Sequence, residues 1–260
     1  MLKLGIYVDA ENVRLSGGYG MRYEVLIKRL GVGNHILRAN SYVVEDEERI
    51  EQDAEYRDKL YSFFEGLRKA GFKVIKKTVK HYIDDTGFQC RKANADLDLA
   101  VDALVQSQNL DRIILVSGDS DFVRLITALQ NRGIRVEVIG FKNVSRALKE
   151  TADHFVNGFL IPGLIPCEGG SCRLRGWVAK FDEKKGFGFF HYYDPKEEGL
   201  VEKDVFFHTK NAKEGLDLNL FERASNIFEF DLVPSQSKQG KKQGEFEAIN
   251  IDIFQERVLV

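Results

Sequence analysis

The sequence predicts two domains of different class: an open α/β sheet followed by a small all-β barrel. Short apolar runs at 4–8 and 112–116 lack polar alternation, as buried parallel strands do. Helical stretches alternate with such runs, which is typical of an open, mainly parallel sheet with helices on both faces. The C-terminal third changes to short β-rich runs separated by turns. We therefore expect domains at 1–158 and 174–257, joined by a linker at 159–173.

The elements of the first domain follow in order along the chain. Strands are expected at 4–8, 35–44, 72–79, 112–116 and 134–139, and helices at about 20–31, 52–70, 95–108 and 120–132. The second of these helices is supported by apolar side chains at helical spacing between Tyr56 and Leu67. Gly71 and Gly133 are helix-stop signals. Pro and Gly concentrate at 161–172, which is linker chemistry.

The composition describes a globular chain with balanced charge. Lys+Arg number 38 and Asp+Glu 40, so the net charge of -2 lacks the basic excess of many nucleic-acid binders. No apolar run approaches the roughly 20 residues that span a bilayer, so no membrane association is expected. Cys90, Cys167 and Cys172 are too few for a disulfide framework and lack the spacing of a zinc site. Because the N-terminal residues do not read as a signal peptide, a cytoplasmic location is expected.

Acidic residues gather where two predicted strands end. Asp9 ends the first strand, and Asp119 and Asp121 follow the strand at 112–116. Ligands of open α/β sheets bind outside the carboxyl ends of the strands, where the strand order reverses. Asp96 stands near the start of a predicted helix, where one turn can present two acids on one face. If the two strands are neighbours, these carboxylates converge.

Crowded carboxylates repel one another, so protons or cations must neutralise such a cluster. Mg²⁺ or Mn²⁺ takes oxygen ligands and is held by a few carboxylates together with substrate phosphates. Two such ions could activate a water and stabilise the departing oxygen in phosphodiester hydrolysis. Each acid alone has an equally good structural reading: Asp119 as a helix cap, Asp9 in a turn, Asp98 as a solvated helix residue. The glycine-rich stretch 16–20 is not a dinucleotide fingerprint, and no P-loop lysine follows it.

Residues 1–157 resemble the NYN domain, specifically the LabA-like branch related to PIN-type nucleases. The matching motifs are Tyr7-Val8-Asp9 with Asn12, K-x-x-x-D-x-x-L-A-x-D from Lys92 to Asp102, and L-V-S-G-D-S-D-F at 115–122. The resemblance implies a PIN-like sheet with Mg²⁺ held by Asp9, Asp96, Asp119 and Asp121, and with Asn12 assisting. Asp102 is either a metal ligand or an acid behind the ligands. One extra residue separates Lys92 from Asp96 compared with the tighter family motif.

An aromatic pattern marks the second domain. On a strand, Phe187, Phe189 and His191 share a face, as do Phe206 and His208. An exposed face of rings is a platform for bases, each stacked base contributing about 1–3 kcal/mol. The rings of opposite parity, Phe190 and Phe207, are expected in the core. Gly186 and Gly188 remove side chains from the strand and so permit close approach.

These segments resemble the two RNA-binding motifs of a cold-shock domain, on an OB-type five-stranded barrel. The resemblance extends from 176 to 251 and implies that single-stranded RNA or DNA stacks on Phe187, Phe189, Phe206 and His208, beside His191 and with Lys185 near phosphate. Two aromatic positions of the family hold Lys180 and Thr209 here. By simple parity Trp177 points to the other side of the strand and does not replace the lost ring.

Three functions fit these features. The leading hypothesis is a Mg²⁺- or Mn²⁺-dependent ribonuclease whose cold-shock domain captures single-stranded RNA. The alternative is a non-catalytic RNA-binding regulatory protein with the NYN domain as an interaction module, since fold does not fix function. A phosphatase or nucleotide-processing enzyme would leave the barrel without a role. The apolar segment 155–161 leaves a homo-oligomer open, and binding that depends on stacking predicts a shallow salt dependence.

Overall fold

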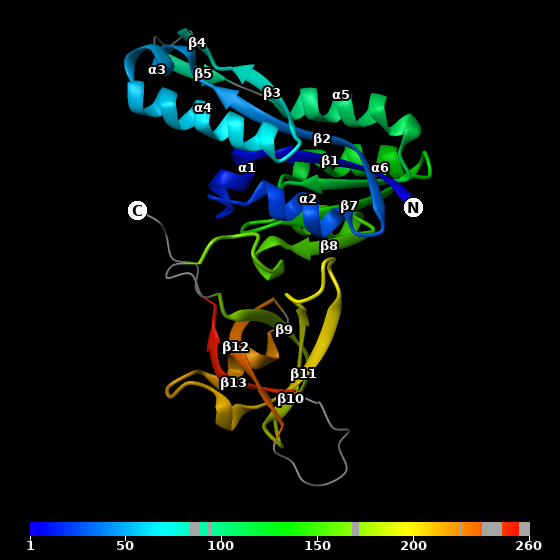
Figure 1. Ribbon diagram of the computed structural model, residues 1–260, viewed down its shortest axis with the longest axis vertical. Coiled ribbons are helices and arrows are strands. Elements are labelled where there is room, and N and C mark those ends of the chain that lie inside the picture. The colour runs from blue at the N-terminus through cyan, green and yellow to red at the C-terminus, as the bar shows by residue number, and fades with distance from the viewer. Residues whose placement is uncertain (84–88, 93–94, 168–171, 224, 236–245, 255–260) are drawn as a thin grey trace. The chain divides into compact units, whose positions relative to one another are not determined.

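The computed structural model describes residues 1–83, 89–92, 95–167, 172–223, 225–235 and 246–254 (Figure 1). The chain divides into two compact units, Met1–Gly158 and Phe159–Val260. The first unit is a parallel sheet covered by helices, and the second is a closed barrel of five strands. In the part of the chain so described, no helix is long and apolar enough to cross a membrane.

The sheet of the first unit has six parallel strands in the order β3-β2-β1-β6-β7-β8. Its strands are β1 (Leu2–Asp9), β2 (Asn34–Glu45), β3 (Lys73–Thr78), β6 (Arg112–Val116), β7 (Arg135–Gly140) and β8 (His154–Asn157). The central pair, β1 and β6, runs in register from Leu4 opposite Arg112 to Val8 opposite Val116. The chain builds one half of the sheet outward from β1 and the other half outward from β6. The strand order therefore reverses between these two strands, which confirms the predicted open parallel sheet.

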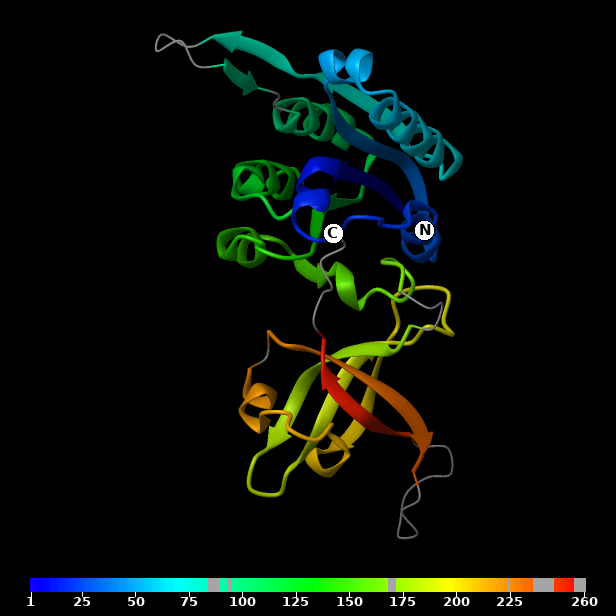
Figure 2. The ribbon, with the colours of Figure 1, turned by 90° about the vertical axis from the view of Figure 1, so that its left-hand side faces the viewer.

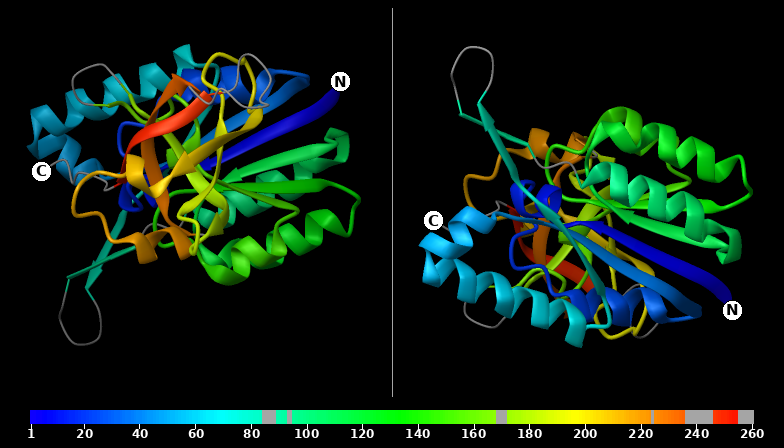
Figure 3. Two further views of the ribbon diagram at one scale, coloured as in Figure 1. Left: turned by 90° about the horizontal axis from the view of Figure 1, so that it is seen from below. Right: turned by 90° about the horizontal axis from the view of Figure 1, so that it is seen from above.

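Helices cover both faces of this sheet (Figures 2 and 3). They are α1 (Ala10–Leu15), α2 (Tyr23–Gly31), α3 (Glu47–Gln52), α4 (Ala54–Lys69), α5 (Asp96–Gln106), α6 (Val123–Gln130) and α7 (Arg146–Thr151). One core lies under α5, α6 and α7, where Leu99, Ile126 and Leu148 pack on the sheet with no exposed surface. The other face carries α2 and α4, which contact β2 and β3.

Several short elements were not anticipated by the hydrophobic pattern. These are α1, α3, α7, β8 and the antiparallel pair of β4 (Lys80–Ile83) and β5 (Gln89–Lys92). Each is six residues or fewer, which is too short to display a helical or strand period above the background. Side chains place two of the helices instead, because Asp9 accepts a hydrogen bond at the start of α1 and Asp46 does so at the start of α3.

The second unit is a closed barrel in the strand order β10-β11-β13-β12-β9. Its strands are β9 (Leu174–Asp182), β10 (Phe187–Tyr193), β11 (Glu202–His208), β12 (Ile227–Pro234) and β13 (Phe246–Ile253). All pairs are antiparallel except β11 with β13. Stacked phenylalanines fill the interior, with Phe190 lying 4.1 Å from Phe207 and 5.0 Å from Phe230 between ring centroids. The architecture is consistent with an OB-type fold.

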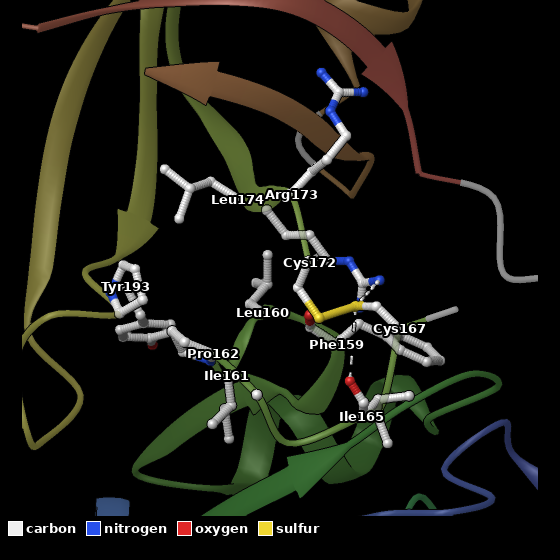
Figure 4. A pocket seen from close by; sticks show the side chains of 13 residues that line it. Phe159, Leu160, Ile161, Pro162, Ile165, Cys167, Cys172, Arg173, Leu174 and Tyr193 are labelled. Atoms are coloured by element: carbon white, nitrogen blue, oxygen red, sulfur yellow. Dashed lines mark hydrogen bonds between the residues drawn. A yellow bond between two sulfur atoms is a disulfide. The ribbon is translucent and has the colours of Figure 1, made fainter. Parts of the chain in front are cut away.

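The cysteines depart from the sequence expectation. A disulfide joins Cys167 to Cys172, whose Cα atoms lie 5.4 Å apart, so one crosslink forms although three cysteines cannot build a framework. It borders a pocket of about 100 Å³ in the second unit (Figure 4). Close by, Arg175 donates to Glu229 Oε1 at 2.9 Å and lies over the ring of Phe254. The disulfide lies within the segment 159–173 that was expected to be a linker.

Candidate acidic site and aromatic face

The acidic site lies at the carboxyl ends of β1 and β6, where the strand order of the sheet reverses. Asp9 is the last residue of β1, and its side chain is 6% exposed. Asp119 and Asp121 follow β6 in the next turn, and Asp96 is the first residue of α5. Open α/β sheets bind ligands at this position because the loops on either side diverge and leave a crevice.

Hydrogen bonds connect the end of β1 to the turn after β6. Asp9 Oδ1 accepts from the backbone N–H of Asn12 at 3.0 Å, and Asp9 Oδ2 accepts from the hydroxyl of Ser117 at 3.2 Å. In return, Asn12 Oδ1 accepts from the backbone N–H of Gly118 at 2.8 Å. Two segments 108 residues apart are thereby fixed against each other.

Gly118 fits a close approach at this turn. A Cβ at residue 118 would lie 3.3 Å from the Cα of Val144 and 3.4 Å from Asn12 Oδ1. Any side chain at residue 118 would therefore require its neighbours to shift by a few tenths of an ångström. The glycine of the S-G-D-S-D-F motif therefore serves packing around the site.

Asp119 has a structural role as well as a candidate functional one. Its Oδ1 accepts from the backbone N–H of Asp121 at 2.9 Å, which caps the 3-10 helix η2 (Ser120–Phe122). Its own backbone N–H donates to Ser117 Oγ at 3.2 Å. Phe122, which is 1% exposed, anchors the short helix in the core. The cap uses one carboxylate oxygen of Asp119, and a carboxylate has capacity for further contacts.

The four acids act on one another electrostatically. The pKa of Asp9 is raised to about 6, first by burial and then by the charges of Asp96 and Asp119, against the lowering effect of hydrogen bonds from Asn12 and Ser117. The pKa of Asp96 is also raised, first by burial and then by Asp119 and Asp121. The structure thus brings these carboxylates close enough to disfavour one another's charge. A bound cation would reverse this effect.

Asp102 is not brought to this group. It lies six residues beyond Asp96 on α5, about 9 Å along the helix axis at 1.5 Å per residue. Its Oδ2 accepts from the hydroxyl of Tyr42 at 2.8 Å, inside the sheet–helix core. Asp98 points elsewhere and forms an ion pair with Lys77 at 2.8 Å. The side chain of Lys92, which the family motif includes, lies outside the described residues.

The donor set fits a partly hydrated hard cation. Across the described ranges, no three His, Cys, Asp or Glu side chains are grouped so that they could hold one metal ion together. Mg²⁺ rarely needs such a cage, because it keeps several waters and binds through one or two carboxylates together with substrate phosphates. The carboxylate oxygens of Asp9, Asp96, Asp119 and Asp121 are of the type that Mg²⁺ and Mn²⁺ take.

The aromatic face lies on β10 and β11 of the barrel. Phe189 stands opposite Phe206 and Phe187 opposite His208. The ring of Phe206 lies 5.7 Å from that of Phe187 and 5.8 Å from that of Phe189, and Phe189 is 38% exposed. Phe190 and Phe207, of opposite parity, are fully buried, which confirms their expected place in the core.

Polar groups flank these rings. Lys185 Nζ lies 5.9 Å from the ring centroid of Phe187 and 3.7 Å from a carboxylate oxygen of Asp182. His208 Nδ1 accepts from the backbone N–H of Lys210 at 3.2 Å. His191 Nδ1 is in hydrogen-bond contact with Asp204 across the strand pair. The structure therefore gathers every predicted barrel residue on one surface, with its two histidines held in place.

Gly188 permits a close approach, as the sequence indicated. A Cβ on Gly188 would lie 2.2 Å from the backbone oxygen of Lys180 and 2.7 Å from the ring of Phe207. The group that approaches Gly188 is the neighbouring strand β9 of the barrel. Gly186 has φ of +66° in the turn before β10, a conformation that favours glycine.

Trp177 lies on the same face of the barrel as the predicted rings. The pairing of β10 with β9 shifts between Phe189, which faces Lys180, and Phe190, which faces Val178. The extra residue in this β-bulge reverses the alternation, so that Trp177 stands opposite His191. The prediction that Trp177 points away from the rings was wrong because simple alternation does not hold across a bulge.

Comparison with known protein families identifies the family of the chain. A family model described as NYN domain matches residues 3–161, and the chain belongs to this family. The chain is similar to the low amplitude and bright protein LabA of Synechococcus elongatus, with 28% identity over 100 residues, which are 36% of this chain and 53% of LabA. It thus spans about half the length of that curated relative.

A solved structure is also similar to the chain. The crystal structure of a protein of unknown function from Vibrio parahaemolyticus has 28% sequence identity, with a TM-score of 0.46. The likeness covers 60% of this chain and 91% of that protein. Because the NYN match ends at residue 161, the cold-shock resemblance of the barrel remains a prediction.

Proposed function

We propose that this protein is a ribonuclease that uses Mg²⁺ or Mn²⁺ at the acidic site and captures single-stranded RNA on the barrel. The NYN family, which belongs to the PIN-like nucleases, favours phosphodiester hydrolysis. The observation that carries the proposal is the group of four carboxylates at the reversal of strand order, where burial and mutual repulsion raise the pKa of Asp9 to about 6. Such a group is unfavourable on its own and favourable around a cation.

The residues of the chain have distinct tasks in this proposal. One or two of the carboxylates of Asp9, Asp96, Asp119 and Asp121 would hold each cation, together with waters and substrate phosphate. Asn12 and Ser117 keep the turn after β6 in contact with the end of β1, and so fix the distance between Asp9 and Asp119. The cation, when bound, would supply charge for the scissile phosphate and make a water more acidic. Burial of Asp9 limits access of bulk water and strengthens these interactions.

RNA cleavage tests the acidic site directly. Labelled single-stranded RNA is incubated with the full chain and Mn²⁺ or Mg²⁺, and Asp119→Asn is compared with wild type. The expected result is a loss of more than about 100-fold, beyond the 10–100-fold typical of residues behind a metal ligand. Asp98→Asn is the matched control, because it removes an acid of α5 that pairs with Lys77. Equal cleavage by wild type and Asp119→Asn would remove these acids from the mechanism.

Capture by the barrel rests on the ring positions. RNA is recognised mainly where its bases are unpaired and able to stack, and Phe189 and Phe206 offer adjoining rings at the surface. Phe206→Ala removes a ring that contacts two others, and we expect roughly tenfold weaker binding of a labelled oligouridine. Tyr61→Ala, which removes an exposed ring of α4, should bind as wild type does. Unchanged binding by Phe206→Ala would exclude the platform.

The second candidate is a non-catalytic RNA-binding regulator in which the NYN domain is an interaction module. It is favoured by the fact that the described residues hold no ready set of three metal-ligating side chains. Calorimetry with Mn²⁺ separates the two functions. Uptake of Mn²⁺ by wild type but not by Asp119→Asn supports the ribonuclease, whereas no uptake together with intact RNA binding supports the regulator.

A further inference from the structure

The β-bulge in β9 places on the aromatic face a ring that is not part of the cold-shock motifs. Ala179 is the extra residue, lying between Val178, which pairs with Phe190, and Lys180, which pairs with Phe189. On the near side of the bulge, Trp177 pairs with His191. Residues that are directly opposite in neighbouring strands share a face of the sheet. Trp177 and Lys180 therefore both stand on the outer face, next to β10.

The environment of Trp177 is that of a surface ring with fixed neighbours. Its ring centroid lies 5.5 Å from that of His191 and 5.8 Å from that of Tyr193. Tyr193 is 5% exposed and supports one side, whereas Trp177 itself is only partly buried. The interior rings of the barrel differ, since Phe190 and Phe207 have no exposed surface. Trp177 therefore belongs to the surface of the barrel and not to its core.

His191 continues the row of rings along β10. Phe187, Phe189 and His191 occupy successive outward positions, about 6.6 Å apart at 3.3 Å per residue. Asp204 contacts His191 Nδ1 and so fixes the plane of the imidazole beside the indole. On the other side of this row, Lys180 is exposed and stands opposite Phe189. An aromatic pair next to a lysine combines stacking with attraction for a phosphate backbone, which is the usual composition of a site for single strands.

We propose that Trp177 and His191 form an additional base-stacking position, which extends the platform of Phe187, Phe189 and Phe206 by at least one nucleotide. The ligand is a single-stranded nucleic acid, with its backbone passing Lys180. This inference rests on the proposed capture of RNA by the barrel. Lys180 occupies a position that is aromatic in the cold-shock family. Because of the bulge, Trp177 would take the place of that missing ring.

The chain contains one tryptophan, so its fluorescence reports on this position alone. Unlabelled oligouridine is titrated into the full chain while tryptophan emission is recorded, and binding of a labelled oligouridine is followed by anisotropy in parallel. A base stacked on the indole quenches its emission. We expect quenching that saturates at the same oligonucleotide concentration as the anisotropy change.

Substitutions then separate stacking from support of the barrel. Trp177→Ala should weaken binding by about 5- to 150-fold, which corresponds to one stacked base. Trp177→Phe, which keeps an aromatic ring, should recover most of the affinity, and His191→Ala should reduce the quenching while leaving the tryptophan in place. Far-ultraviolet circular dichroism establishes that each variant is folded. Tyr61→Ala, an exposed ring in the other unit, is the matched control.

The outcomes distinguish this inference from the proposed function. Oligouridine binding with unchanged tryptophan emission and with wild-type affinity of Trp177→Ala and His191→Ala would overturn the additional position and leave capture by the phenylalanines intact. Absence of any oligonucleotide binding by wild type would overturn both. Quenching together with loss of affinity in Trp177→Ala and its recovery in Trp177→Phe supports the position.

Discussion

The two edges of the parallel sheet both bury carboxylates, and their electrostatics are opposite. Toward the amino-terminal edge, Glu137, the third residue of β7, is 4% exposed and receives hydrogen bonds from Arg112 and Arg135, which begin β6 and β7. Burial alone would raise its pKa, but the two arginines outweigh burial and lower it. At the carboxyl-terminal edge, the charged groups that act on Asp9 are the acids Asp96 and Asp119, and its pKa is raised.

Glu137 has positively charged partners within the chain, and the charged groups that act on Asp9 are acidic. Glu137 is satisfied by the protein, so its charge adds to the stability of the folded state. Asp9 is buried beside like charges that raise its pKa, and a cation that joins the group would stabilise its ionised form. Strain of this kind tends to lie at functional sites. The contrast is a physical argument for ligand binding at the carboxyl-terminal edge that does not depend on family membership.

After Asp119→Asn, the largest expected effect on RNA cleavage comes from Ser117, which connects the two halves of the acidic site. Ser117→Ala removes the hydrogen bond to Asp9 and the acceptor for the backbone N–H of Asp119. We expect RNA cleavage to fall by about 10- to 100-fold, as for other residues that orient metal ligands. Ser107→Ala, at a serine that is equally buried but lies at the end of α5, should cleave as wild type does. Wild-type cleavage by Ser117→Ala would show that the hydrogen bonds of the Ser117 hydroxyl do not serve the acidic site.

Divalent cation should stabilise the chain through the carboxyl-terminal edge alone. A ligand that binds only the folded state adds about 2.7 kcal/mol to the free energy of unfolding at 100 times its Kd. Denaturation with and without Mn²⁺ measures this gain. Wild type and Glu137→Gln should both show it, and Asp119→Asn should not. An equal gain in Asp119→Asn would place the cation elsewhere.

Glu137→Gln should destabilise the chain at neutral pH. Loss of the charge at a position bonded to two arginines is expected to lower the free energy of unfolding by roughly 1.5–3 kcal/mol. Because the pKa of Glu137 is lower in the folded state than in the unfolded state, this contribution is present above the ordinary glutamate pKa and is lost as the pH falls through the lowered value. Urea denaturation of wild type and Glu137→Gln should therefore show a difference in the free energy of unfolding that is smaller below pH 4 than at pH 7. A difference that is constant with pH would contradict the role given to the charge of Glu137.

Asp119→Asn should leave the free energy of unfolding unchanged or raise it slightly, whereas Glu137→Gln should lower it. Asparagine caps a helix as well as aspartate does, so η2 keeps its cap. The substitution also removes a charge that raises the pKa of Asp9 and Asp96. Without divalent cation, we expect a free energy of unfolding equal to that of wild type or higher by up to about 1 kcal/mol. A clear loss of stability in this variant would mean that Asp119 serves the fold and not a cation.

Much of the fold follows from local signals in the sequence. The continuous apolar runs in β1 and β6 mark buried parallel strands, and the helical spacing of α4 marks an amphipathic helix. The strand order was not specified, because the pairing of β1 with β6 joins segments more than 100 residues apart. Short elements such as α7 escape detection for lack of a period.

Some residues of the candidate sites were also located by local sequence signals, and others were not. Asp9 and Asp119 were found because Asp9 ends one strand and Asp119 lies in the turn after another, so their meeting depends only on the two strands being neighbours. Asp102 shares a motif with Asp96, but the pitch of α5 carries it to Tyr42. Trp177 was misplaced because a bulge changes the face of every residue on one side of it. Sequence alternation predicts faces well within regular pairing and fails across one extra residue.

Location of Mn²⁺ in a crystal tests the central claim most directly. Crystals of the full chain are soaked in Mn²⁺, and anomalous scattering identifies the ions without reference to any assay of activity. The account predicts one or two Mn²⁺ ions among Asp9, Asp96, Asp119 and Asp121, and none beside Glu137, where two arginines already neutralise the carboxylate. No ion at the four acids under saturating Mn²⁺, with the carboxylates as accessible as before, would contradict it.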